Sequence, residues 1–112
     1  MIRPQDKKNP ICILIIDDQV ADRISTRVEC ERVFRNHEGG LILEESPCVD
    51  EAIKRMTTRI YQIILLDKDL GKDELGQAIS GLNYIRLLQE IQPVSKIIML
   101  TASEKPSEIS LA

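Results

Sequence analysis

Short apolar runs alternate along the chain with segments of helical periodicity. The first run, ICILII (11–16), is too short for a helix and is typical of a strand covered on both faces. Three further runs predict strands: LILEE (41–45), YQIILL (61–66) and KIIML (96–100). The pattern therefore predicts four strands separated by longer connections.

Each connection contains a predicted helix. Apolar residues recur at intervals of three to five from Ala21 to Arg35, where HEGG ends the pattern. The second helix is expected in SPCVDEAIKRMTTRI (46–60), with Ser46 as N-cap and Pro47 at its first position. The third lies in SGLNYIRLLQEIQP (80–93) and is stopped by its final proline. Strands that alternate with helices indicate a parallel α/β sheet with helices on both faces.

Composition narrows the functional classes. The 112 residues predict one domain, with a polar lead over 1–10 and the domain itself over 11–112. A net charge of -3, a single Phe, two Tyr and no Trp argue against a nucleic-acid partner. No apolar run is long enough for a membrane span or a signal peptide, so we expect a cytoplasmic protein without a membrane partner. The three cysteines show no metal-ligand spacing, and free thiols are expected.

Acidic and hydroxyl side chains follow three of the predicted strands. Asp17 and Asp18 end the first strand, Asp67 and Asp69 follow the third, and Thr101 follows the fourth. In an open parallel sheet the functional crevice lies beyond the carboxyl ends of the strands. Carboxylates that converge there repel one another unless a cation neutralises them. Oxygen ligands without His or Cys favour Mg²⁺.

Three motifs together resemble a known family. ILIIDD on the first strand, IILLD on the third and IIMLTAS on the fourth, with helices between them, are similar to the receiver domain of two-component response regulators. The resemblance covers the chain from Ile11 to its end. It implies a flavodoxin-like (CheY-like) fold with strand order 2-1-3-4, and a phosphorylation switch rather than an enzyme with turnover.

The resemblance also implies a role for each site residue. Asp67 would accept a phosphoryl group from a sensor histidine kinase or phosphotransfer protein, and would also be one of the metal ligands. Asp18 would bind Mg²⁺ directly, Asp17 through a water molecule, and Asp69 through its backbone carbonyl. Thr101 would donate its hydroxyl to the phosphoryl oxygens.

The sequence departs from the receiver pattern in two places. The segment KDLGKDELGQAIS (68–80) is longer than the usual loop, and is either a solvated insertion or a lid or partner-selecting element beside the site. A receiver would continue after Thr101 through a helix, a fifth strand with a Lys and a last helix, and we expect this chain to lack the fifth strand and the last helix, although SEKPSEISLA (103–112) resembles the start of a helix. The fourth strand would then be an exposed edge, and we expect self-association through it.

Two other interpretations remain. The missing Lys would suit a degenerate receiver that acts only as a binding or dimerisation module. The stretch IILLDKDLG also resembles the Asp-x-Asp motif of haloacid-dehalogenase-like phosphohydrolases. In that family Asp67 would be the nucleophile and Asp69 the general acid/base, but Asp17 and Asp18 would have no role.

Overall fold

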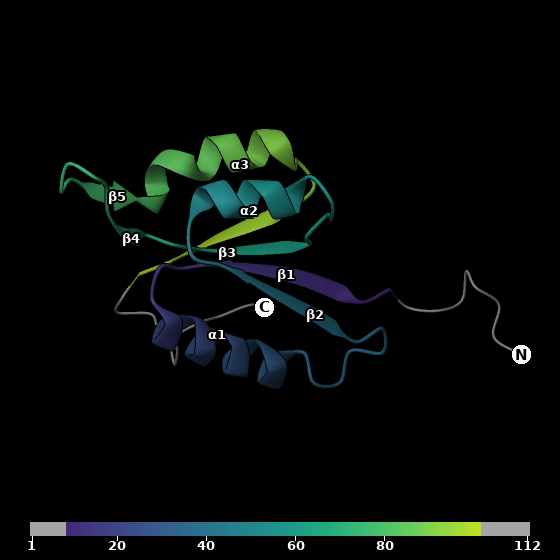
Figure 1. Cartoon of the computed structure of the whole chain (residues 1–112). Helices are drawn as coiled ribbons and strands as arrows, with labels where there is room; N and C mark the ends of the chain where they lie inside the picture. Colours follow the sequence, from purple (N-terminus) through teal and green to yellow (C-terminus); the bar gives the residue numbers. More distant parts are fainter. Residues whose placement is uncertain (1–8, 102–112) are drawn as a thin grey trace, which may run out of the picture.

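A four-stranded parallel sheet with helices on both faces forms the centre of the computed structural model, which describes residues 9–101 (Figure 1). Its strands lie in the order β2-β1-β3-β6, so the predicted order 2-1-3-4 and the flavodoxin-like α/β class are confirmed. The sheet strands are β1 (Ile11–Ile16), β2 (Leu41–Ser46), β3 (Ile63–Asp67) and β6 (Lys96–Leu100). The helices are α1 (Val20–Val33), α2 (Val49–Met56), the 3-10 turn η2 (Gly81–Tyr84) and α3 (Ile85–Ile91).

The two faces of the sheet carry separate apolar layers, because successive side chains of a strand point to opposite faces. On one face Leu14, Ile16, Ile64 and Leu66 pack beneath α2 and α3. On the other face Ile13, Ile15 and Leu65 pack together with Cys30 of α1. The central strands β1 and β3 are thus buried on both sides, which explains their unbroken apolar sequence. Among residues 9–101, no helix is both long and apolar enough to cross a membrane.

The face of α1 that packs against the sheet is not the face that carries its regularly spaced apolar residues. Val20, Ile24 and Val28 are 60%, 54% and 60% exposed, whereas Thr26 and Cys30 are buried. Polar contacts with β2 add to the packing of Cys30, since Arg23 and Arg27 both pair with Glu45. Burial also raises the pKa of the Cys30 thiol to about 11.

The start of α2 differs from the prediction. Ser46 is not its N-cap but the buried last residue of β2, and its backbone carbonyl accepts a hydrogen bond from Asp17 N–H. The Ser46 hydroxyl donates to the carbonyl of Cys48 (2.8 Å), and Cys48 is the N-cap residue. Ser46 therefore belongs to the sheet and not to the helix, because it pairs with Ile16 in the register of β1 and β2.

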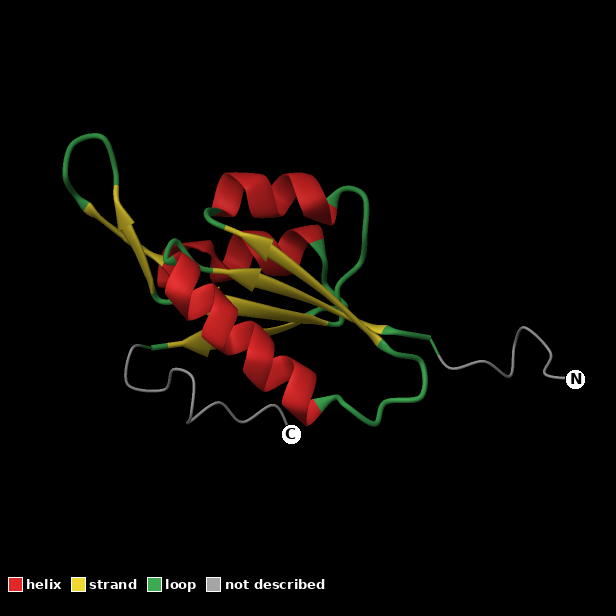
Figure 2. Ribbon diagram, turned by 60° about the horizontal axis from the view of Figure 1, so that its bottom comes forward, coloured by secondary structure: helices red, strands yellow, loops and turns green. Residues whose placement is uncertain are grey.

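The long segment after β3 is a two-stranded antiparallel hairpin rather than an irregular loop. Strands β4 (Asp69–Lys72) and β5 (Ala78–Ser80) project beyond the sheet (Figure 2). The carboxylate of Asp73 accepts hydrogen bonds from the backbone N–H groups of Leu75 and Gln77, and Gly76 has a positive φ of 77°. These features close the turn in the way that Asx turns do.

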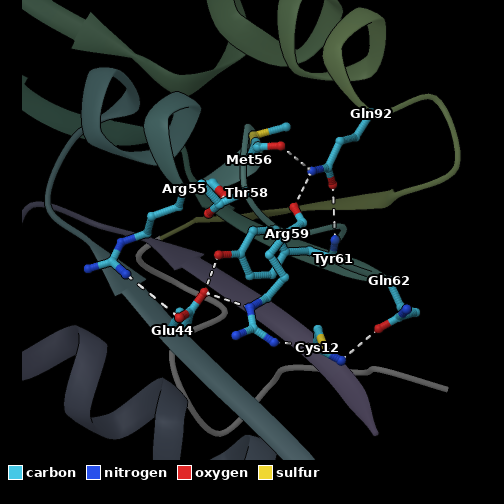
Figure 3. Close-up of polar contacts among 9 residues, drawn as sticks. All are labelled: Cys12, Glu44, Arg55, Met56, Thr58, Arg59, Tyr61, Gln62 and Gln92. Carbon is cyan, nitrogen blue, oxygen red and sulfur yellow. Dashed lines mark hydrogen bonds and ion pairs between the residues drawn. The ribbon is translucent and has the colours of Figure 1, made fainter. Parts of the chain in front are cut away.

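A polar network fixes the opposite edge of the sheet, where β1 and β3 begin (Figure 3). The buried side chain of Gln92 links the chain after α3 to the last residue of α2 and to the segment between α2 and β3, through Arg59 and Tyr61. Glu44 of β2 accepts a hydrogen bond from the Tyr61 hydroxyl and pairs with Arg55 and Arg59. The pKa of Tyr61 is raised, mainly because the ring is buried and also because its hydroxyl donates to Glu44. The SEKPSEISLA segment lies outside the described residues.

Candidate metal centre

The strand register explains why distant aspartates meet at the carboxyl edge of the sheet. Ile16 of β1 is paired with Leu66 of β3, and each of these residues is followed directly by an aspartate. As a result Asp17, Asp18 and Asp67 each offer a carboxylate oxygen, and these oxygens lie within 4.8 Å of one another. The structure thus brings together three of the four predicted metal-binding residues.

Backbone and side-chain donors orient the three carboxylates. The backbone N–H of Gln19 donates to Oδ1 of Asp17 (3.0 Å), and the side-chain amide of Gln19 donates to Oδ2 of Asp18 (3.1 Å). The N–H of Asp69 donates to Oδ1 of Asp67 (3.2 Å). Arg23 holds the backbone of the loop, because its guanidinium donates to the carbonyl of Asp17 (2.7 Å). The carboxylates are therefore positioned by the fold itself.

The charge and chemistry of the cluster suit a hard divalent cation. Asp17 and Asp67 are 1% and 4% exposed, so bulk water screens them only weakly, while Asp18 is half-buried. Two carboxylates at about 4 Å repel by roughly 4 kcal/mol at an effective dielectric of 20. An all-oxygen donor set is what Mg²⁺ and Ca²⁺ prefer. The three residues fit such a cation, which would also offset their repulsion.

The other two predicted site residues lie near the cluster but outside it. The side chain of Asp69 is exposed on β4 and is not one of the three clustered carboxylates, so a contribution through its carbonyl stays a prediction. Thr101 is half-buried and directly follows β6. The N–H of Lys68 donates to the carbonyl of Leu100 (2.8 Å), so β6 ends beside the residue after Asp67. Thr101 is therefore placed at the same edge.

Two glycines beside the centre were not recognised from the sequence. A Cβ on Gly71 would lie 2.7 Å from Oδ2 of Asp18, and a Cβ on Gly81 would collide with the carbonyl oxygen of Asp67. The Gly81 N–H donates to the carbonyl of Lys68 (2.7 Å), so this backbone approach is part of the structure. In the sequence, only the position of Gly81 at the start of a predicted helix hinted at a special role for it. No feature of the sequence indicated that Gly71 lies against Asp18.

Comparison with known proteins gave matches at the level of structure. No family model and no curated protein matches the sequence. A response regulator from Burkholderia pseudomallei, solved with a phosphorylated aspartic acid, a calcium ion and citrate, is similar with a TM-score of 0.61 and 27% identity. That match covers 81% of this chain and 46% of the other, so this chain spans about half the length of that protein.

Two structures of the response regulator MaeR are also similar. A mutant bound to sulfate has a TM-score of 0.64 at 21% identity, with 86% of this chain and 70% of that chain covered. MaeR bound to beryllium trifluoride has a TM-score of 0.61 at 18% identity, with 90% and 80% covered. The resemblance inferred from the three sequence motifs is thus confirmed at the level of the fold. The neighbours are response regulators, and this chain has the flavodoxin-like fold of their receiver domains.

Proposed function

We propose that the chain is a phosphoacceptor receiver domain whose Asp67 takes a phosphoryl group in a phosphorelay. The observation that carries the proposal is the convergence of Asp17, Asp18 and Asp67 at the carboxyl ends of adjacent strands. The similar protein from Burkholderia pseudomallei, with its phosphorylated aspartic acid and calcium ion, supports it. The cation proposed for this chain is Mg²⁺.

The reaction requires a nucleophile and charge stabilisation. An oxygen of the Asp67 carboxylate attacks the phosphorus of a phosphohistidine on a sensor kinase or phosphotransfer protein. The new O–P bond forms as the N–P bond breaks, and the imidazole leaves as its neutral form after taking up a proton. The product is an acyl phosphate on Asp67. Because the carboxylate is held by the Asp69 N–H, its orientation is set before the donor arrives.

The remaining site residues would stabilise the negative charge of the phosphoryl group. Asp17, Asp18 and Asp67 would hold the cation, Asp69 would add its carbonyl, and a bound Mg²⁺ supplies positive charge to the phosphoryl oxygens. Thr101 would donate its hydroxyl to a phosphoryl oxygen from the neighbouring strand end. Asp17 and Asp18 also favour the receiver over a haloacid-dehalogenase-like phosphohydrolase, since that mechanism gives them no task.

Mg²⁺ should stabilise the fold through this centre. At a Mg²⁺ concentration ten times its Kd, the free energy of unfolding should rise by about 1.4 kcal/mol, which corresponds to a rise in Tm of roughly 6 °C. Asp18→Asn should lose most of this response. Without metal, the same variant should be more stable than the parent by about 1 kcal/mol, because one repelling charge is removed from a half-exposed position. Thermal unfolding with and without Mg²⁺ measures both effects.

Asp69→Asn is the matched control for this experiment. Its side chain lies outside the cluster, so the variant should keep the response of the parent to Mg²⁺. Equal stabilisation of the parent and Asp18→Asn by Mg²⁺ would place the cation elsewhere and remove the support for the proposed site.

We also propose that the chain associates with itself through β6. Within residues 9–101 this strand pairs only with β3, which leaves one edge of its backbone without a sheet partner. The mass from light scattering should therefore rise with protein concentration. Ile98→Lys on β6 should suppress the rise, whereas Ile24→Lys on the exposed side of α1 should not. A compact monomer at every concentration would show that the edge is not used.

A further inference from the structure

The β4–β5 hairpin touches the metal centre through its first strand. Gly71 in β4 lies so close to Asp18 that an added Cβ would come within 2.7 Å of Oδ2. Real Cβ atoms essentially never come so close to another heavy atom, so something would have to move, and the Asp18 carboxylate, at the end of a flexible side chain, would move more easily than the strand. Asp69, two residues earlier in the same strand, donates its N–H to Asp67. One strand therefore contacts two of the three clustered carboxylates.

Two apolar side chains, Leu70 and Ile79, anchor the hairpin. Leu70 is buried among the residues beneath α2 and α3, and Ile79 of β5 packs against the same layer. Farther out the hairpin is exposed, and Leu75 at its turn is 83% exposed. The hairpin extends away from the sheet in both views (Figures 1 and 2). Its position thus depends on the Leu70 and Ile79 anchors and on its contacts with the metal centre.

We propose that Gly71 is a positioning residue for Asp18, and that the hairpin is thermodynamically coupled to the cation bound at the centre. This inference rests on the proposed function. The β4 backbone limits the space open to the Asp18 carboxylate, so it favours the orientation that faces Asp17 and Asp67. A cation that fixes the same carboxylate then stabilises the seated hairpin. Coupling of this kind is reciprocal, so a seated hairpin must also raise the affinity for the cation.

The hairpin contains its own control for testing Gly71. Gly71 and Gly76 both have positive φ values, 85° and 77°, so an alanine is strained at either position. A Cβ on Gly76, however, meets no atom within 4 Å. The difference between Gly71→Ala and Gly76→Ala therefore isolates the contact with Asp18 from the cost of the backbone conformation.

Calorimetric titration with Mg²⁺ tests the positioning role. Gly71→Ala should weaken binding at least tenfold relative to the parent, because the Cβ displaces the carboxylate or lifts the strand. Gly76→Ala should change the Kd by less than twofold. Equal affinities for the two variants would overturn the inference while leaving the metal site of the proposed function intact. A parent that binds no Mg²⁺ would overturn both.

Hydrogen exchange of the hairpin amides tests the coupling without relying on activity. In the parent and in Gly76→Ala, Mg²⁺ should slow the exchange of residues 69–80, whereas in Gly71→Ala it should change it little. Exchange in the parent that does not respond to saturating Mg²⁺ would show that the hairpin is independent of the cation.

A double-mutant cycle without metal tests the contact itself. Gly71→Ala should destabilise the parent more than Gly76→Ala does. With Asp18→Ala as background, the two alanine variants should cost the same, because the colliding carboxylate is gone. If Gly71→Ala still lost more stability than Gly76→Ala in the Asp18→Ala background, the contact between Gly71 and Asp18 would be refuted. This outcome does not depend on whether Asp67 is phosphorylated.

Discussion

Gln92→Ala should lower the free energy of unfolding by about 3–5 kcal/mol, since buried polar groups that lose their partners cost roughly 1–3 kcal/mol each. The Gln92 side chain is 4% exposed and accepts a hydrogen bond from the N–H of Tyr61 (3.0 Å). Its amide donates to the carbonyls of Met56 (3.0 Å) and Arg59 (2.6 Å). Truncation leaves these three backbone groups without their Gln92 partner, removes one acceptor of the Ser95 hydroxyl (2.8 Å), and leaves a cavity as well.

Urea unfolding measures this loss, and Gln89→Ala provides the matched control. Gln89 is an exposed residue of α3, and its replacement by alanine should change stability by no more than about 0.5 kcal/mol. If both variants were equally stable, the network in Figure 3 would not hold this edge of the sheet. Mg²⁺ should still stabilise Gln92→Ala, because the network lies at the opposite end of the strands from the metal centre.

The sheet and its acidic edge were predictable because they depend on simple rules. A strand buried on both faces needs an unbroken apolar run, which ICILII and IILL provide. Parallel strands end at the same edge of a sheet, so Asp17 and Asp67 must lie close together when β1 and β3 are neighbours. The strand order itself came from the resemblance to receiver domains and not from the periodicity.

Features that depend on tertiary contacts were not predictable in the same way. The strands of the hairpin in 68–80 have no regular alternation of apolar and polar residues, and they pair because the carboxylate of Asp73 closes the turn. In α1 the apolar residues recur at helical intervals but lie on the exposed side, while Thr26 and Cys30 are buried. The role of Gln92 arises from three backbone groups that are distant in sequence.

Asp67→Asn should abolish phosphorylation completely, because an amide oxygen is not a competent nucleophile toward phosphorus. Asp67 is the buried carboxylate at the end of the central strand β3, and it lies in the cluster with Asp17 and Asp18. Asp69→Asn is again the matched control, because it changes a nearby exposed carboxylate by the same chemistry. In the receiver mechanism the Asp69 side chain has no chemical role, whereas a haloacid-dehalogenase-like enzyme would need it as general acid/base.

The most direct test is the intact mass of the protein after incubation with acetyl phosphate and Mg²⁺. Transfer to Asp67 releases acetate and leaves one phosphoryl group on the chain, which hydroxylamine should remove as expected of an acyl phosphate. The proposed function predicts one added phosphoryl group on the parent and on Asp69→Asn, and none on Asp67→Asn. An unmodified parent would instead indicate a binding module. Continuous release of phosphate from a simple phosphomonoester that is lost in Asp69→Asn would indicate a phosphohydrolase, and either result would contradict the proposal.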